Sequence, residues 1–183
     1  MKSSFLLLVF FLFRQHNFIL KKTIPKNQHS YVSLFAKTDT LKENVLLKIN
    51  HTQINSPVWA NIILSQQRMY VYENGVLLAI YKVTTGNKTH KTPCMNRKPS
   101  GPMHLKYTSK KFPGGNYMGL GNMPYAIFIK GGYAIHGTTP GNFSLLGRIG
   151  SHGCIRLHPV NAKTLYELVQ KYTLKNTWVT VQK

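Results

Sequence analysis

Hydrophobic and polar residues alternate over short stretches from Val45 onward, a pattern typical of β-strands. Two of these stretches, residues 58–65 and 68–73, have the length and the β-branched and aromatic content of paired strands. An Asn-Gly pair at 74–75 follows them and leads into a third apolar stretch; this dipeptide is the strongest short signal for a two-residue hairpin. The pattern predicts an antiparallel three-stranded meander at the start of a mainly β domain.

Residues 85–124 interrupt the strand pattern, because they are rich in Gly, Pro, Asn and Lys and leave room for one strand, near residues 103–107. A loop region of this length in a compact domain is usually functional or mobile. Residues 125–137 then predict two strands joined at a Gly-Gly turn, with His136 at the end of the second. We therefore expect His136 at a strand edge that faces the loops.

Residues 158–172 change to helical spacing. Pro159 occupies a favourable first helical position, and an apolar stripe follows that is typical of packing against a core. The stripe consists of Leu165, Leu168, Val169 and Tyr172. Residues 177–183 predict a last strand. The expected fold is thus mainly β, with one amphipathic helix in the C-terminal half and a long loop region.

The segment before this domain predicts export. An apolar run over residues 5–13 follows Lys2, which fits the hydrophobic region of a secretory signal and falls short of the roughly 20 residues of a spanning helix. We assign residues 1–20 to an export signal, 21–44 to a polar linker and 45–183 to the domain. A mis-assigned start or an uncleaved amphipathic tail are the alternatives.

Charge limits the possible chemistry. The chain has 24 Lys and Arg against 4 acidic residues, a formal net charge of +20, which favours polyanionic partners such as nucleic acid, anionic lipid surfaces or an acidic cell-wall polymer. So few acids leave little room for a mechanism with paired carboxylates. The basic residues lack the interleaved aromatics of a nucleic-acid platform, so no specific nucleic-acid partner is expected. A basic, non-catalytic binding module remains the alternative from another class.

The segment 149–159 concentrates reactive side chains around Cys154, one of two cysteines; a disulfide with Cys94 would block both thiols. A thiol becomes nucleophilic when an imidazole or a positive field lowers its pKa. Gly153 before it, Arg156 after it and the start of the helix a few residues on are expected to favour the thiolate at neutral pH.

Two histidines are candidates for the base. His152 is too close along the chain for good geometry, so we favour His136, oriented by a backbone carbonyl of residues 137–139 or by the amide of Asn142. A zinc site is the rival interpretation, built from Cys154, His152, His158 and His136. Hydrolytic zinc sites typically include a carboxylate for the proton, and none lies nearby in the sequence. No metal or cofactor is expected.

The spacing of these residues resembles a known family. IHGT at 135–138, followed by SHGCIR at 151–156, resembles the histidine and the Ser/Thr-His-Gly-Cys signature of YkuD-type L,D-transpeptidases. Residues 63–86 and 123–137 also look like this family's opening hairpin and the strands leading to its histidine. The resemblance covers about residues 59–183. It implies a β-sandwich with the cysteine at the mouth of a cleft under a flap.

The resemblance also implies roles for single residues. Cys154 would be the nucleophile and His136 the base, held by the carbonyl of Gly137. The N–H groups of Gly153 and Cys154 would form the oxyanion hole. The other implied residues are His152 and Ser151, which would shape the pocket, and Arg156, Tyr125 and Met123, which would bind substrate.

The implied activity is acyl transfer from the third residue of a peptidoglycan tetrapeptide stem to an amine, with release of D-alanine. The partners would be peptidoglycan stem peptides in the bacterial cell envelope or periplasm, and we expect a monomer. The same chemistry with water gives an L,D-carboxypeptidase, and with a protein amine it attaches a lipoprotein to the wall. The sequence leaves these acceptors open.

Overall fold

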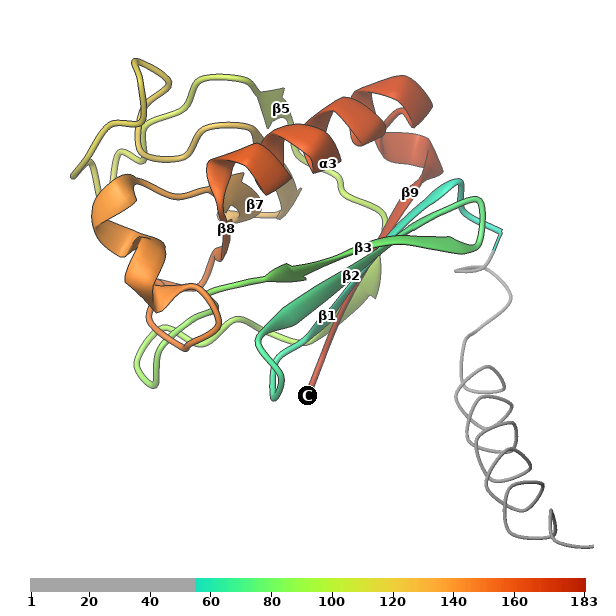
Figure 1. Ribbon diagram of the computed structural model, residues 1–183, viewed down its shortest axis with the longest axis horizontal. Helices are drawn as coiled ribbons and strands as arrows, with labels where there is room; N and C mark the ends of the chain where they lie inside the picture. Colours follow the sequence, from blue (N-terminus) through green and yellow to red (C-terminus); the bar gives the residue numbers. More distant parts are fainter. Residues whose placement is uncertain (1–54) are drawn as a thin grey trace, which may run out of the picture. The chain divides into compact units, whose positions relative to one another are not determined.

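The computed structural model describes residues 55–183, and the predicted export signal, the linker and the start of the predicted domain lie outside these residues. The described chain forms two sheets and one long helix (Figure 1). The first sheet contains, in spatial order, β3 (Val76–Lys82), β2 (Arg68–Glu73), β1 (Val58–Ile63), β9 (Thr177–Gln182) and β4 (Met95–Arg97). The second contains β5 (Met103–His104), β6 (Ala126–Lys130), β7 (Tyr133–Gly137) and β8 (Ile155–Leu157). The helices are η1 (Pro140–Leu145), α3 (Pro159–Tyr172) and η2 (Leu174–Asn176), of which η1 and η2 are 3-10 helices.

The core lies where the two sheets and α3 meet. Alternate residues of the strands point into it, as the period of two requires, and α3 packs along β6 and β7 and also contacts β1. Leu165 and Val169 of the helix are 1% exposed and Leu168 is 8% exposed, so the predicted apolar stripe does face the core. None of the described helices is long and apolar enough to cross a membrane.

The opening meander is confirmed. β1 pairs with β2 and β2 with β3, both antiparallel, and Asn74 and Gly75 take φ values of 49° and 79° in the turn between β2 and β3. Positive φ at both central residues is the geometry that makes Asn-Gly a hairpin signal.

Beyond the meander, not every strand pair is antiparallel. β1 pairs with β9 and β7 with β8 in parallel. Parallel neighbours need a connection of a dozen or more residues. The segment between Gly137 and Ile155 provides one for β7 and β8, and nearly the whole domain lies between β1 and β9.

The predicted loop region contains two short strands rather than one. β4 pairs with β9 at an edge of the first sheet, and β5 pairs with β6 in the second. Strands of two and three residues are too short to show an alternating pattern, which explains why β4 was not predicted. β4 follows the segment of residues 83–94, and β5 precedes the segment of residues 105–125.

Candidate active site

The parallel pairing of β7 and β8 brings the cysteine and the histidine to one face of the second sheet. Ile135 pairs with Ile155, and each is 1% exposed because it points into the core. The residues on either side of them therefore point to the opposite face. On that face lie Ala134 and His136 of β7, Arg156 of β8, and Cys154, the residue just before β8. His136 is directly opposite Arg156, which places Cys154 diagonally from the imidazole.

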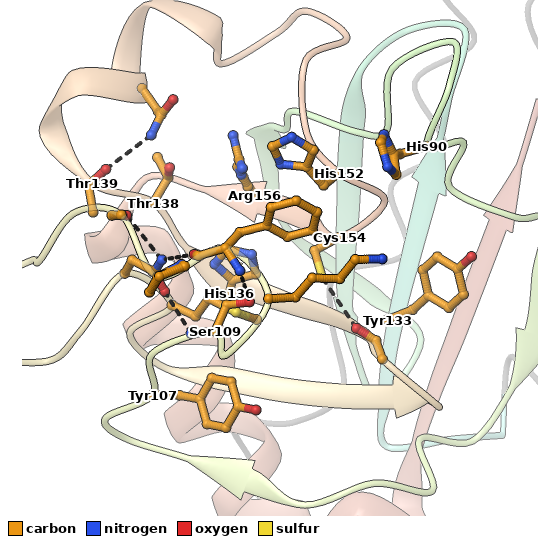
Figure 2. Close-up of a pocket in the computed structure, with 18 of the residues that line it drawn as sticks. His90, Tyr107, Ser109, Tyr133, His136, Thr138, Thr139, His152, Cys154 and Arg156 are labelled. Atoms are coloured by element: carbon orange, nitrogen blue, oxygen red, sulfur yellow. Dashed lines mark hydrogen bonds between the residues drawn. The ribbon is translucent and has the colours of Figure 1, made fainter.

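This face forms the floor of a cavity of about 1070 Å³. Figure 2 shows His136, Cys154, His152 and Arg156 grouped around one space. Three segments wall it in, namely residues 89–91, residues 107–114 and the start of the η1 region at residues 138–142. The prediction that His136 faces the loops is therefore confirmed.

His136 is 4% exposed and fixed in one tautomer. Its Nδ1 lies 2.7 Å from the carbonyl oxygen of Gly137. Since a carbonyl can only accept, Nδ1 carries the proton and Nε2 is left with a lone pair. Burial lowers the pKa of His136 to about 4, the hydrogen bond to Gly137 opposes this, and the charge of Arg156 lowers it further. The imidazole is therefore neutral at neutral pH.

Cys154 is half-buried, and its Sγ–H donates to the carbonyl oxygen of Gly132 over 3.5 Å. Burial raises the pKa of the thiol. A hydrogen bond from the Ala134 backbone and the charge of Arg156 lower this pKa, but by less than burial raises it. The expected thiolate at neutral pH is thus wrong. The helix does not help, because β8 separates Cys154 from the start of α3 at Pro159, roughly 15 Å of extended chain.

The turn that carries Cys154 is organised by Ser151, which is fully buried. Its Oγ accepts a hydrogen bond from Gly153 N–H over 3.1 Å and donates to the carbonyl of Cys154 over 2.6 Å. The Gly153 N–H is consequently occupied, so the expectation that it helps to form an oxyanion hole is wrong. Among the described residues, Cys154 N–H has no acceptor and stays available.

Gly153 itself is required by the backbone. Its φ is 108°, and a Cβ added there would lie 3.0 Å from Cε1 of Tyr133. Tyr133 lines the cavity beside the cysteine (Figure 2), so the glycine lets the turn pass under this ring.

His152 is exposed and its ring is held by the loops. It stacks on Phe112, with centroids 3.9 Å apart and planes at 10°, and contacts His90 edge-on at 5.2 Å. Burial lowers its pKa first, and the charges of Arg156, His90 and Lys111 lower it further. His152 therefore joins the cysteine turn to the loops above it.

The three predicted substrate-binding residues lie in different places. Arg156 lines the cavity half-buried, and its guanidinium has no ion-pair or hydrogen-bond partner among the described residues. Met123 is 7% exposed, lines the cavity and packs in a small cluster with Cys154. Tyr125 is a correction: it does not line the cavity but packs on the main core, with its ring 6.0 Å from that of Tyr166. The next residue, Ala126, packs instead in the small cluster that contains Met123 and Cys154.

Sequence reasoning missed most of the cavity wall. The loops were expected to be functional, but no signal identified the aromatic residues that line it, which are Tyr107, Phe112, Phe128 and Tyr133. For the zinc interpretation, residues 55–183 contain no group of three His, Cys, Asp or Glu side chains able to hold a metal. Cys94 is exposed, and both cysteines are free.

The structure is a two-sheet β domain with a free cysteine and a buried histidine at one cavity, the pair of groups that nucleophilic thiol catalysis requires. Comparison with known proteins defines it further. The sequence model of the YkuD family, described as L,D-transpeptidase catalytic domain, matches residues 57–181, and the chain belongs to this family. The resemblance seen in the sequence and the predicted fold class are confirmed.

Individual relatives agree with this assignment. The chain is 33% identical over 126 residues to the probable L,D-transpeptidase YbiS of Escherichia coli K12, a match that covers 57% of this chain and 39% of that protein. This chain therefore spans well under half of the length of that relative.

Solved L,D-transpeptidase structures share the fold. One from Mycobacterium smegmatis has 21% identity and a TM-score of 0.53, covering 69% of this chain and 59% of that one. One from Stackebrandtia nassauensis has 26% identity and a TM-score of 0.54, covering 68% and 55%. L,D-transpeptidase 3 of Mycobacterium tuberculosis, in complex with a faropenem-derived adduct, has 19% identity and a TM-score of 0.52, covering 69% and 60%.

Proposed function

We propose that this chain is a peptidoglycan L,D-transpeptidase that cross-links stem peptides in the cell wall. One observation carries the proposal: a thiol and a neutral imidazole of fixed tautomer share one face of the β7–β8 pair at the floor of a large cavity. Membership of the YkuD family and the similarity to YbiS support it.

The first half-reaction forms an acyl-enzyme. Nε2 of His136 takes the proton from Sγ of Cys154 as the sulfur attacks the carbonyl carbon of the third residue of the stem. The N–H of Cys154 donates to the oxyanion, and the positive charge of Arg156 stabilises the sulfur as it gains charge. The C–N bond to D-alanine then breaks, and the imidazolium returns its proton to the leaving amine.

The second half-reaction uses the same groups in reverse. An acceptor amine attacks the thioester and His136 takes its proton; as the C–S bond breaks, the imidazolium passes this proton to the sulfur and restores the thiol of Cys154. An amine of a second stem gives a cross-link, water gives a shortened stem, and a protein amine gives wall attachment. We propose the stem amine as the main acceptor.

The proposal includes location and partners. The enzyme acts as an exported monomer in the bacterial envelope, on peptidoglycan stems. With only 4 acidic residues among 183, its positive charge concentrates it on anionic wall material.

The test is to incubate the full chain with purified disaccharide-tetrapeptides and to identify the products by mass spectrometry. We expect cross-linked dimers and one released D-alanine for each dimer. Cys154→Ala should abolish both products, and Cys94→Ala, the matched control, should retain most activity. Shortened stems without dimers would overturn the choice of acceptor, and no D-alanine release under reducing conditions would overturn the proposal.

A covalent probe tests the nucleophile directly. Because a relative carries a faropenem-derived adduct, faropenem should acylate Cys154. Peptide mapping should find the added mass on the peptide that contains Cys154 and not on the one that contains Cys94. Labelling of both peptides to the same extent would contradict the assignment, since it would show ordinary thiol reactivity.

A further inference from the structure

The loop over residues 107–123 is held in a fixed shape by the side chain of Asn122. Its Oδ1 accepts a hydrogen bond from Ser109 N–H over 3.0 Å, and its Nδ2 donates to the carbonyl of Gly114 over 3.0 Å and to that of Phe112. Phe112 N–H in turn donates to Ser109 Oγ over 3.1 Å. These bonds fix the backbone of the intervening residues 110 and 111.

The base of the loop is closed as well. Tyr107 N–H donates to the carbonyl of Leu120, and Met123 N–H donates to the carbonyl of Tyr107, each over 3.0 Å. The loop therefore presents its side chains from a built platform, which reduces the ordering cost of binding a ligand.

This platform presents positive charge to the cavity. Lys110 and Lys111 line the cavity from the loop, and Lys91 lines it from the neighbouring segment. No acidic residue is found among the described residues that line the cavity. The only two acids of residues 55–183, Glu73 and Glu167, are both paired with lysines elsewhere, at 2.9 and 3.7 Å.

One of the loop lysines, Lys111, is connected to the cysteine turn through the Phe112 ring. Nζ of Lys111 lies 5.6 Å from the centroid of the Phe112 ring, and that ring stacks on His152, two residues before Cys154. Arg156 is on the sheet that forms the floor, so the loop lysines are a second cationic wall of the same cavity.

We propose that Lys91, Lys110 and Lys111 form a carboxylate subsite that makes the enzyme prefer stem peptides with free side-chain carboxylates over their carboxamides. This inference rests on the proposed transpeptidase function and specifies its substrate class. The chemistry follows from charge complementarity, because a cavity wall with three ammonium groups and no carboxylate favours an anionic ligand and gives a neutral amide no such gain. The carboxylate belongs to the donor stem or to the acceptor stem.

The experiment compares matched stems that differ only in one group. Donors and acceptors whose third residue carries a free carboxylate or its carboxamide are tested in all four combinations, and kcat and KM are measured for each. One variant is Lys110→Gln with Lys111→Gln. The control is Lys98→Gln with Lys130→Gln, which removes the same charge from exposed positions that do not line the cavity.

We expect wild type to favour the carboxylate by about fivefold in kcat/KM, the scale of a few exposed ion pairs. The Lys110/Lys111 variant should lose this preference through a higher KM for the carboxylate stem, so that its kcat/KM values for the carboxylate and the carboxamide become equal. The arm in which the preference disappears, donor or acceptor, identifies the stem that is recognised. Raising the salt concentration should reduce the preference of wild type and leave that of the variant unchanged.

Two results would overturn the subsite: equal kcat/KM for carboxylate and carboxamide in wild type, or the same loss of preference in both double variants. The second result would show that overall charge and not the loop is responsible. Neither result touches the proposed function, since both require transfer to be measurable. Absence of transfer from every stem would instead contradict the transpeptidase assignment.

Discussion

The buried imidazole of His136 should make the stability of the domain depend on pH in a defined window. An unfolded histidine titrates near 6.5, and the folded pKa of His136 is about 4. Between these values the unfolded state binds a proton that the native state does not, so stability falls as pH falls from 6.5 to 4. The difference in pKa corresponds to roughly 3 kcal/mol of unfolding free energy.

Urea unfolding, followed by the fluorescence of the buried Trp59, measures this loss at a series of pH values. Wild type should lose roughly 3 kcal/mol between about pH 6.5 and pH 4. His136→Gln, which cannot titrate, should show a much shallower dependence whatever its absolute stability. His104→Gln is the control, because it removes a histidine of the same domain that does not line the cavity, and the change in slope is compared between the two variants.

The comparison of slopes decides the question. If His136→Gln loses as much stability as wild type over this window, the imidazole is not held neutral in the native state. The account of a neutral base at rest would then be wrong.

Three further predictions concern the cysteine turn. At pH 7, His136→Gln should slow alkylation of Cys154 by iodoacetamide by about two orders of magnitude, the scale of a general-base contribution. His152→Ala should change the alkylation rate only a few-fold, while acyl transfer from a tetrapeptide falls. If the two variants show the opposite effects, the roles of the two histidines are exchanged. Ser151→Ala should lower the unfolding free energy by about 2 kcal/mol, because a buried N–H and a buried carbonyl each lose their partner. The exposed Ser144→Ala should stay within about 0.5 kcal/mol, and equal midpoints in urea would refute the role of Ser151. Gly153→Ala should lower the unfolding free energy by about 1–3 kcal/mol because of the positive φ at this position, and it should reduce acyl transfer. Thermal unfolding and D-alanine release measure the two effects. Wild-type values for both would contradict the close contact of this position with the Tyr133 ring.

Local signals in the sequence were enough to predict the elements that depend on local chemistry. The Asn-Gly turn at 74–75 and the helix that begins at Pro159 were predicted because turn geometry and helical spacing are properties of neighbouring residues. The pairing of β1 with β9 joins residues more than a hundred positions apart, and that of β7 with β8 crosses a long loop. Such parallel neighbours leave no short-range pattern, so their direction could not be predicted.

The candidate site divides in the same way. The sequence was enough to identify the motif around Cys154 and the predicted strand that carries His136, and the family resemblance implied that the two residues act in one site. What each backbone N–H does could not be predicted, because the occupation of Gly153 N–H by Ser151 depends on the exact fold of one turn. Tyr125 was expected to bind substrate but packs on the core, because it precedes β6 with a φ of 56°, a local conformation that the residue pattern does not reveal.

The ionisation of the cysteine required the balance of two opposing effects. A sequence shows the positive charge around Cys154 but not its burial, and burial outweighs the charge of Arg156. Arg156 also disfavours a second positive charge on His136, so it stabilises the thiolate and opposes the imidazolium. A resting ion pair between a Cys154 thiolate and a His136 imidazolium thus gains little from Arg156, and the burial of both side chains opposes this ion pair. The proton should therefore move as the sulfur attacks, when the new C–S bond removes negative charge from the sulfur.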